Sequence, residues 1–359
     1  QPEFTQIDLE MSFVDVDDIL TIAEGYIHRL FKEVLKLDVP LPLERMTYRD
    51  AMERFGSDKP DTRFGMEICD CSALVKDCGF SVFSGAVANG SVRAIVAKGG
   101  AKTLSRKEID KLTEQARGIG AKGLAFIRWA DEKPTCSFAK FMSGEELAAL
   151  MAHIGCEQGD AALFVADKNA IVLGVLGQLR LTVAKKLGMI PKDRFNFLWI
   201  TEFPFFEYDE ESGKWLAMHH PFTMPMDECL PYLDSDPGAV RAKAFDLVVN
   251  GTELSSGSMR ITDYELQQRM FEALGLTDEE IEAKFGFLVD AYRYAAPPHG
   301  GMGIGLDRLS MIMCGADSLR DVIAFPKVQN ASELMSECPS FVDEAQLDEL
   351  HIEIKKNAE

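Results

Sequence analysis

The sequence lacks the features that would tie the protein to a membrane. It has no run of about 18 consecutive apolar residues, so no membrane-spanning helix is expected. The N-terminal segment QPEFTQIDLE has neither a Met nor a basic region followed by an apolar one, and so it does not resemble a signal sequence. We therefore expect no membrane partner.

Positive charge is also scarce. The chain has 38 Lys and Arg against 58 Asp and Glu, a formal net charge of -20 at pH 7. Because a phosphate backbone is held mainly by clustered Lys and Arg, this balance argues against broad, sequence-independent binding of nucleic acid, and we expect no DNA partner. A nucleic-acid partner would have to meet a local basic surface or another part of the protein. The basic run at 98–111 indicates a solvated face, with a weak RNA contact as the alternative.

Cysteine pairs with the C-x-x-C spacing are missing as well. None of the eight cysteines belongs to a C-x-x-C pair, and eight are too few for a disulfide scaffold in 359 residues. The pattern indicates free thiols in a reducing compartment. Cys69, Cys71 and Cys78 could form a zinc site, but their spacing is not a standard one and favours buried packing.

The composition that is present is typical of a folded protein with more than one domain. Of 359 residues, 47% are hydrophobic and 27% are charged, and the length exceeds that of a typical single domain. The alternation at 4–11 predicts a strand that begins abruptly, as at a cut end, with its pairing partner expected before residue 1. The turn-rich segment GSDKPDTRFG at 56–65 predicts a crossing between domains.

The region from 66 to 190 predicts short strands and helices of α+β type, and it follows an amphipathic helix at 17–37. Ser105 with Glu108, and Ser143 with Glu146, have the spacing of capping boxes. We find no catalytic constellation in this region. Strands are expected at 92–97, 123–129 and 161–166, and helices at 106–117, 144–154 and 168–187.

From Phe195 onward, long apolar segments joined by hairpin-like turns predict a large antiparallel sheet. One turn covers 209–214, and Asn250-Gly251 forms another. The segments with strand character cover 197–206, 215–222, 245–254 and 258–262, and the third of these includes the turn at Asn250-Gly251. Helices are expected at 263–274 and 278–293.

The segment GMGIGLDR at 301–308 has the most distinctive pattern. Glycines alternate with apolar residues, so one face of a strand would be apolar and the other would carry no side chains. A flat base can lie on such a bare face, and Arg308 could stack on it or meet a polyphosphate. The alternative is that the glycines mark tight packing or a bulge. The adjoining Asp307 and Arg308 favour the nucleotide site.

This segment resembles the third signature motif of class II aminoacyl-tRNA synthetases, and other segments narrow the resemblance to aspartyl-tRNA synthetases of the bacterial type. The resemblance implies an α+β fold, in which an antiparallel sheet is flanked by helices, with an inserted α+β domain. The implied catalytic domain covers 1–64 and 191–359, and the insertion covers 65–190. The segments are QPEFTQIDLE, GSDKPD, AMHHPFTMP, AFDLVVNGTELSSGSMRI, FGFLVDAYRYAAPPHGG and RDVIAFPK.

The activity implied by the resemblance is that of a ligase. Such an enzyme activates L-aspartate with ATP to aspartyl-adenylate and transfers the aspartyl group to the 3′ end of tRNA(Asp), with Mg²⁺ as cofactor. A cytoplasmic homodimer is the implied form. The rivals are an asparaginyl-tRNA synthetase or an amide-forming paralogue, against which the insertion argues, and a non-catalytic binding module derived from a synthetase.

Arg260 is the residue that we expect to select the substrate. A guanidinium matches a carboxylate with two parallel hydrogen bonds, and the resemblance implies that Arg260 holds the side chain of aspartate. Because asparagine has nearly the same shape, discrimination must come from charge. A structural ion pair is the commoner role of a strand arginine in general.

His219 and His220 stand between a predicted strand and a proline turn. Adjacent side chains on a strand point to opposite faces, so at most one is expected to face the pocket. The resemblance implies that His219 is the one at the amino acid, while His220 is structural or takes part as the pocket closes. The alternative is a pair of histidines that only pack and form hydrogen bonds.

Asp246 and Glu253 flank the predicted turn at Asn250-Gly251, on strands that would bring them together. Paired carboxylates of this kind suit Mg²⁺ that is bound largely through triphosphate oxygens, and the resemblance implies that Glu253 binds ATP and its metal. The alternative is a pair of exposed hairpin carboxylates, against which the apolar run at 247–249 argues.

The resemblance also assigns residues of the first strand and of the glycine segment. Gln6 and Asp8, which share one strand face, match positions that line the amino-acid pocket. The implied catalytic set is Arg260, Arg308 and Glu253. The positions expected at ATP are Gln1, Glu253, Gly305, Leu306, Asp307 and Arg308.

Parts of the family pattern are not found in the sequence. These are the second-motif arginine that clamps the α-phosphate, the first motif, the anticodon-reading β-barrel and a loop with an aspartate-binding lysine. We therefore expect the chain alone to exchange pyrophosphate poorly. Thr252, Ser255 and Ser256 stand where an aromatic residue and glycines would be expected.

Overall fold

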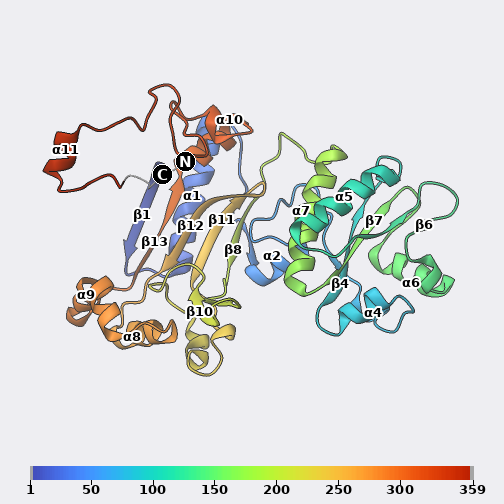
Figure 1. Cartoon of the computed structure of the whole chain (residues 1–359), viewed down its shortest axis with the longest axis horizontal. Helices are drawn as coiled ribbons and strands as arrows, with labels where there is room; N and C mark the ends of the chain where they lie inside the picture. Colours follow the sequence, from blue (N-terminus) through green and yellow to red (C-terminus); the bar gives the residue numbers. More distant parts are fainter. Residues whose placement is uncertain (1–2, 356–359) are drawn as a thin grey trace. The chain divides into compact units, whose positions relative to one another are not determined.

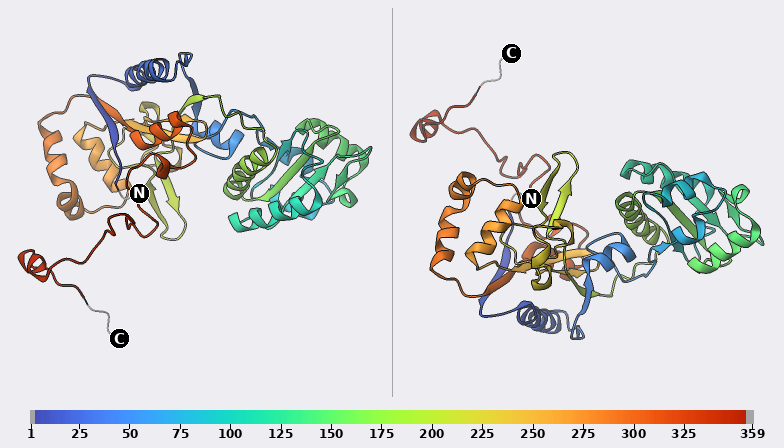
Figure 2. Two further views of the ribbon diagram at one scale, coloured as in Figure 1. Left: turned by 90° about the horizontal axis from the view of Figure 1, so that it is seen from above. Right: turned by 90° about the horizontal axis from the view of Figure 1, so that it is seen from below.

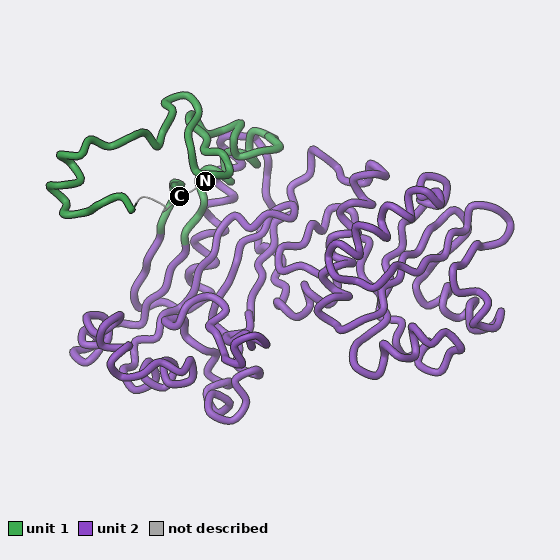
Figure 3. The backbone as a smooth tube through the Cα atoms, in the orientation of Figure 1, with its two compact units in different colours: residues 1–8, 303–359 green, residues 9–302 purple. Residues whose placement is uncertain are grey.

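The computed structural model describes residues 3–355. The chain divides into two compact units, residues 1–8 with 303–359 and residues 9–302, which Figure 3 colours separately. The predicted domain limits at residues 64 and 190 coincide with no limit of these units and stay predictions. Within the described residues, no helix is both long and apolar enough to cross a membrane.

The largest sheet has six strands in the order β1-β13-β12-β11-β8-β2 (Figure 1). Strands β8, β11 and β12 pair antiparallel, whereas β2 pairs with β8 in parallel. The predicted antiparallel sheet is confirmed for the central strands, and the sequence patterns did not predict β2. The bounds are β1 Gln6–Ser12, β2 Glu44–Thr47, β8 Phe197–Thr201, β11 Ala244–Val249, β12 Thr252–Met259 and β13 His299–Gly305.

Helix α1, Val16–Val34, covers one face of this sheet, as two views show (Figures 1 and 2). Its apolar residues recur every three or four positions, so one stripe of the helix is buried. Phe31 packs edge-on against Phe197 of β8. Two residues along the same strand, Trp199 donates from Nε1 to the carboxylate of Glu24 at 3.0 Å, which satisfies both polar groups inside the packed layer.

The predicted turn at Asn250-Gly251 joins β11 to β12. Its two residues have φ of 52° and 82°, the left-handed conformation that Asn and Gly tolerate best and that a two-residue hairpin favours. A second hairpin joins β9, Phe206–Asp209, to β10, Lys214–Ala217. Both predicted hairpins are confirmed.

Two predicted strands are shorter than their apolar segments indicate. The strand expected at 197–206 ends at Thr201, because Glu202 has a φ of 56° and Pro204 has no N–H to donate to a neighbouring strand. The strand expected at 215–222 is reduced to β10.

The segment between residues 66 and 190 forms a five-stranded sheet in the order β3-β4-β7-β5-β6, with antiparallel pairing throughout. Helices α5 and α7 cover one face, and α3, α4 and α6 cover the other. The α+β prediction for this segment is confirmed. The bounds are β3 Cys69–Asp70, α3 Ser72–Val75, α4 Ser81–Val87, β4 Ser91–Ala97, α5 Arg106–Ile119, β5 Ala125–Arg128, β6 Thr135–Cys136, η1 Ala139–Phe141, α6 Gly144–Ile154, β7 Ala161–Asp167 and α7 Asn169–Lys186.

One of the two predicted capping boxes forms. Ser143 and Glu146 cap α6 reciprocally. Ser105 makes no side-chain hydrogen bond at the start of α5, so that prediction is wrong. The carboxylate of Glu108 pairs instead with Lys111 and Lys186, and these two ammonium groups replace the backbone N–H as its partners.

Helices α8, α9 and α10 follow the predicted pattern, whereas the sequence patterns did not predict α2, α11 or the short 3₁₀ helices. Phe271 of α8 stacks on Phe285 of α9, with ring centroids 5.1 Å apart, and buries the apolar face of both helices. Helix α10 follows directly on β13, as the apolar run after Arg308 predicts. The bounds are α2 Tyr48–Phe55, η2 Asp227–Tyr232, η3 Pro237–Ala239, α8 Tyr264–Ala273, α9 Asp278–Tyr294, α10 Leu306–Cys314, η4 Leu319–Asp321 and α11 Glu344–Glu349.

Candidate functional site

The hairpin of β11 and β12 carries the two predicted carboxylates. Asp246 lies opposite Ser256, and Glu253 lies opposite Val248, with a bulge after Leu247. A bulge places two residues of one strand against one of the other. The prediction that Asp246 and Glu253 belong to one hairpin is therefore confirmed, although they do not face each other in register.

Asp246 is a buried carboxyl group with an unused oxygen. It is 5% exposed, and its Oδ1 has no hydrogen-bond partner among the described residues. Burial, together with the charges of Glu253 and Asp58, raises the pKa of Asp246 to about 7, against a hydrogen bond from Ser256 that lowers it. A cation that approached this carboxyl group would stabilise its charged form and so favour ionisation.

Lys59 brings a positive charge to these carboxylates. Its Nζ lies 3.2 Å from Oε2 of Glu253 and 3.6 Å from Oδ2 of Asp58. The sequence interpretation assigned no site role to Lys59 and Asp58, because it used the segment 56–65 as a domain crossing and as part of the family resemblance. The signal that could have found them is the charge alternation in GSDKPD, one of the segments that carries the family resemblance.

The two carboxylates fit a cation that arrives with a polyphosphate. Mg²⁺ in such sites is held by one or two protein carboxylates, and phosphate and water supply its other ligands. Asp246 offers its unused oxygen, and Glu253 is close enough to raise the pKa of Asp246. Between residues 3 and 355, no three His, Cys, Asp or Glu side chains form a group suited to a metal, so these residues build no all-protein cage.

Arg260 directly follows β12, which ends at Met259. The strand predicted at 258–262 therefore stops before Arg260. Its backbone N–H donates to the carbonyl of His299 at 2.9 Å, and it forms an isolated bridge with Thr223. Its side chain is partly buried, and no carboxylate among the described residues pairs with it. The expected alternative, a structural ion pair, is therefore absent within residues 3–355.

His220 is the side chain that Arg260 does contact. Nη1 of Arg260 lies 2.8 Å from Nε2 of His220, and the N–H of Phe222 donates to Nδ1 of the same ring at 3.2 Å. Burial and the charge of Arg260 lower the pKa of His220 to about 4, so the ring is neutral at pH 7. A neutral partner fixes the guanidinium and leaves its charge uncompensated.

His219 faces different neighbours. Its ring packs edge-on against Phe203, with centroids 4.8 Å apart. Desolvation lowers the pKa of His219, while the charges of Glu253 and Asp58 raise it, so the ring lies within electrostatic range of these carboxylates. Because β10 ends at Ala217, strand alternation does not apply to the two histidines. Which of them faces the amino acid therefore stays a prediction.

The glycine face of β13 is not bare. A Cβ at Gly301 would overlap the carbonyl oxygen of Leu9, and one at Gly303 would lie 2.8 Å from Nε2 of Gln6. The predicted open face for a flat base is therefore wrong at these two positions. The glycines allow close packing of β1, and Gly303 seats the amide of Gln6, which is one of the predicted pocket residues.

The two glycines should respond differently to alanine. Gly301→Ala requires backbone to move and is expected to destabilise the chain by about 2–4 kcal/mol. Gly303→Ala displaces only the end of a flexible Gln6 side chain, and its cost should be about 1 kcal/mol. Urea unfolding of the two variants beside the wild type measures the difference, and equal losses would contradict the assignment of Gly301 to backbone contact.

The other predicted residues lie in the unit of residues 1–8 and 303–359. Leu306 donates its N–H to the carbonyl of Thr5 at 2.9 Å, and Oδ2 of Asp307 accepts from the N–H of Thr5 at 3.2 Å. Gly305 is the N-cap of α10, Arg308 is exposed in its first turn, and Asp8 is exposed in β1. Gln1 lies outside the described residues.

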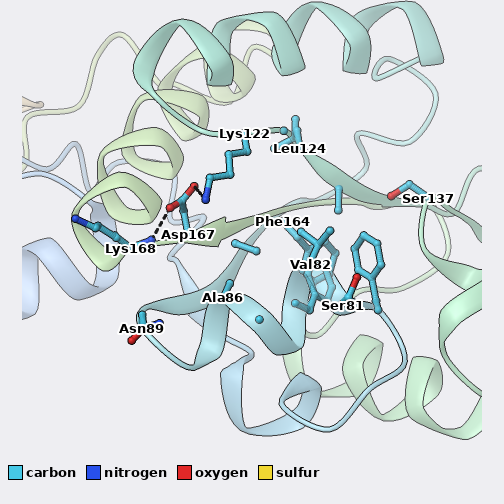
Figure 4. A pocket seen from close by; sticks show the side chains of 16 residues that line it. Ser81, Val82, Ala86, Asn89, Lys122, Leu124, Ser137, Phe164, Asp167 and Lys168 are labelled. Atoms are coloured by element: carbon cyan, nitrogen blue, oxygen red, sulfur yellow. Dashed lines mark hydrogen bonds and ion pairs between the residues drawn. The ribbon is translucent and has the colours of Figure 1, made fainter.

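A pocket of about 750 Å³ in the segment between residues 66 and 190 contains none of the predicted site residues (Figure 4). Its wall includes Val82, Leu124 and Phe164, and near them Nζ of Lys122 lies 3.7 Å from Oδ2 of Asp167. No observation connects this pocket with the hairpin carboxylates or with Arg260.

Comparisons with known proteins identify the family of the chain. Residues 1–329 match the family model of tRNA synthetases class II (D, K and N). The chain is 59% identical over 358 residues to the aspartate–tRNA ligase of Ruminiclostridium cellulolyticum, covering 99% of this chain and 60% of that protein. It is 56% identical over 360 residues to the aspartate–tRNA(Asp/Asn) ligase of Lachnoclostridium phytofermentans, covering 100% of this chain and 60% of that protein.

The chain thus spans 60% of the length of these relatives. Among solved structures, an aspartyl tRNA synthetase from Entamoeba histolytica aligns with 92% of this chain and 44% of its own, at 17% identity and a TM-score of 0.42. That similarity is too weak to support an inference about the site.

Proposed function

Since the chain belongs to the class II tRNA synthetases of the D, K and N group, we propose that it carries most of a site that activates L-aspartate with ATP. The product is aspartyl-adenylate, from which the aspartyl group passes to the 3′ end of tRNA(Asp). In this assignment residues 1–64 and 191–359 belong to the catalytic domain, and 65–190 is an inserted domain.

The observation that carries this proposal is the uncompensated charge of Arg260. A partly buried guanidinium normally has a carboxylate partner, because an isolated charge is costly to desolvate. Arg260 has instead a neutral His220 at 2.8 Å. The side-chain carboxylate of bound aspartate would complete the pair, and asparagine, with a neutral amide, would not.

The remaining residues divide between the two substrates. Arg260 holds the side-chain carboxylate and His220 positions Arg260, while His219, Gln6 and Asp8 line the amino-acid pocket. Arg308 neutralises charge on the polyphosphate, close to the N-terminus of α10, where backbone N–H groups also favour anions. Gln1, Gly305, Leu306 and Asp307 complete the binding of ATP.

The chemistry is a displacement at phosphorus. An α-carboxylate oxygen of aspartate bonds to the α-phosphorus of ATP, the bond from that phosphorus to the bridging oxygen breaks, and pyrophosphate leaves. The protein positions the two anions and neutralises their charge. Asp246 and Glu253 would hold Mg²⁺, which supplies positive charge to the phosphate oxygens.

The specificity for tRNA has two candidates. The relative from Lachnoclostridium phytofermentans is named as a ligase for tRNA(Asp/Asn), whereas the one from Ruminiclostridium cellulolyticum is named simply as an aspartate–tRNA ligase. We favour tRNA(Asp) as substrate, and we propose a cytoplasmic homodimer as the working form. Charging of both tRNAs is the second candidate.

Exchange of labelled pyrophosphate into ATP tests the proposal. The complete protein that contains this chain should exchange pyrophosphate with aspartate, and at least about 100-fold more slowly with asparagine. The side-chain carboxylate of aspartate pairs with Arg260, whereas the neutral side-chain amide of asparagine leaves Arg260 unpaired. Exchange driven by asparagine would support the asparaginyl alternative instead. The absence of exchange with either amino acid would favour a non-catalytic module. Charging of tRNA(Asp) and tRNA(Asn) transcripts then separates the two tRNA specificities.

A further inference from the structure

Helix α7 is attached to the segment of residues 56–66 by a contact between backbones. A Cβ at Gly56 would overlap the carbonyl oxygen of Leu173, and one at Gly177 would overlap the carbonyl oxygen of Gly56. Neither position has room for a side chain. Gly56 also ends α2 with a φ of 65°, which glycine adopts without strain.

A second attachment is the side chain of Arg180, which follows Gly177 on α7 by three residues and is 1% exposed. Its Nη2 donates to the carbonyls of Asp61 at 3.0 Å and Gly65 at 2.5 Å, and its Nε donates to the carbonyl of Met66 at 3.2 Å. All three acceptors belong to the 56–66 segment, so one side chain closes this segment onto α7.

The guanidinium of Arg180 is also enclosed by two aromatic rings. It lies 4.9 Å from the ring centroid of Phe55 and 4.4 Å from that of Phe64, distances at which a cation interacts with the ring face. Burial lowers the pKa of Arg180 to about 10, so the group remains charged at neutral pH. The charges of Asp61 and Glu67 partly offset this effect of burial. Within residues 3–355 the hydrogen bonds of this buried cation go to backbone carbonyls, so the group fixes backbone position.

The segment that Arg180 holds reaches the candidate site through Asp61. The carboxylate of Asp61 accepts hydrogen bonds of 2.9 and 2.7 Å from Arg63. A Cβ at Gly251, in the turn of the β11–β12 hairpin, would lie 3.1 Å from the Cβ of Asp61. Lys59 precedes Asp61 by two residues and pairs with Glu253, two residues after Gly251. Holding Asp61 therefore limits where Lys59 can extend.

We propose that Arg180 is a positioning residue for the candidate site. Arg180 holds residues 61–66 so that Lys59 stays in contact with Glu253. The inference rests on the proposed function, because it places Arg180 behind the residues assigned to ATP and its metal. It also gives the segment from 65 to 190 a part in forming the site, through α7.

Two variants separate positioning from general stability. Arg180→Lys keeps the charge but loses the planar fork that reaches three carbonyls. Arg93→Lys is the matched control. Arg93 is also buried, at 6% exposure, and it pairs with Glu53 and Asp70 but not with residues 57–66. Phe64→Leu removes one ring and keeps every hydrogen bond of Arg180, and it serves if Arg180→Lys does not fold.

Hydrogen exchange of the 359-residue chain gives the first readout. In Arg180→Lys, or in Phe64→Leu to a smaller degree, the amides of residues 57–66 should exchange about tenfold faster, while those of β4 and β7 keep their wild-type rates. Arg93→Lys should leave residues 57–66 unchanged. The inference would be overturned if the amides of residues 57–66 exchanged at the wild-type rate in folded Arg180→Lys. It would also be overturned if the amides of the whole segment 66–190 exchanged faster by the same factor.

Pyrophosphate exchange by the complete protein gives the second readout. Arg180→Lys should lower kcat/KM for ATP by about 10-fold or more, and Arg93→Lys by less than about 3-fold. In a Lys59→Ala background, Arg180→Lys should add less than about 2-fold, because both changes act on one contact. Full additivity would rule out action through Lys59. If the wild type shows no aspartate-dependent exchange, the proposed function fails, and the amide rates still decide whether Arg180 holds the segment.

Discussion

Arg260→Leu is expected to abolish aspartate-dependent pyrophosphate exchange in the complete protein that contains this chain. The substitution removes the charge that would pair with the substrate carboxylate and leaves that carboxylate in a partly desolvated site. Losing one partner of such a pair costs about 3–5 kcal/mol, which corresponds to a fall of about 100- to 3,000-fold in kcat/KM. Measurement of exchange over a range of aspartate concentrations gives this value.

A second change separates charge from geometry at the same position. Arg260→Lys keeps a positive charge but cannot donate two parallel hydrogen bonds, so its activity should lie between those of the wild type and Arg260→Leu. The preference for aspartate over asparagine should decrease from the wild type to Arg260→Lys and further to Arg260→Leu, because the proposed discrimination depends on this charge.

Arg241→Leu is the matched control. Arg241 is a partly exposed arginine that already has two carboxylate partners, Glu202 and Glu228. Its replacement should change exchange by less than about 3-fold, since exposed ion pairs contribute little. Near-normal exchange by folded Arg260→Leu would remove Arg260 from the site. An equal loss in Arg241→Leu would show that both variants act through stability.

The residues that local sequence patterns placed correctly are those whose conformation depends on their neighbours in the chain. Asn250 and Gly251 predict their own turn, because a tight hairpin needs positive φ at both positions. Ser143 and Glu146 predict their own cap in the same way. The same spacing at Ser105 predicted a cap that does not form, because the carboxylate of Glu108 pairs with Lys186, which is distant in sequence.

The parts of the site that could not be predicted depend on contacts distant in sequence. Lys59 meets Glu253 across 194 positions, and no local period records such a pair. The alternating glycines predicted an open face, but the neighbouring strand β1 decides what lies above Gly303, and there it is the Gln6 amide. The histidines were judged by strand alternation, which does not hold beyond the end of β10. Sequence therefore identified most of the candidate chemistry but not the pairing of its groups.

Asp246→Asn is expected to change activity and stability in opposite directions. The oxygen that would bind Mg²⁺ loses its charge, so pyrophosphate exchange should fall by about 100-fold and require more Mg²⁺. In the absence of metal, however, the variant should be the more stable protein at pH 8. The wild type must there keep a charged carboxylate that is 5% exposed and has one oxygen without a hydrogen bond from any residue of 3–355.

The pH dependence of this stability difference has a definite sign. The pKa of Asp246 is about 7 in the folded state and 3.8 ordinarily, so the folded wild type holds a proton that the unfolded chain has lost between these values. Its stability therefore falls as pH rises from about 4 to 7 and stays lowered above that. Asn does not titrate, so the advantage of Asp246→Asn should grow between pH 5 and pH 8, to roughly 2–4 kcal/mol.

Urea unfolding in EDTA at pH 5 and pH 8 measures the effect, and Asp160→Asn provides a control of opposite sign. Asp160 is also 5% exposed. Burial raises its pKa, but Lys98 and the N–H groups of Gly99 and Glu157 outweigh burial and hold that pKa below its usual value. Its charge thus stabilises the fold above pH 4, and Asp160→Asn should destabilise the chain at pH 8. If both variants lose stability at pH 8, Asp246 has a partner for its charge, and the proposed cation site at the β11–β12 hairpin is wrong.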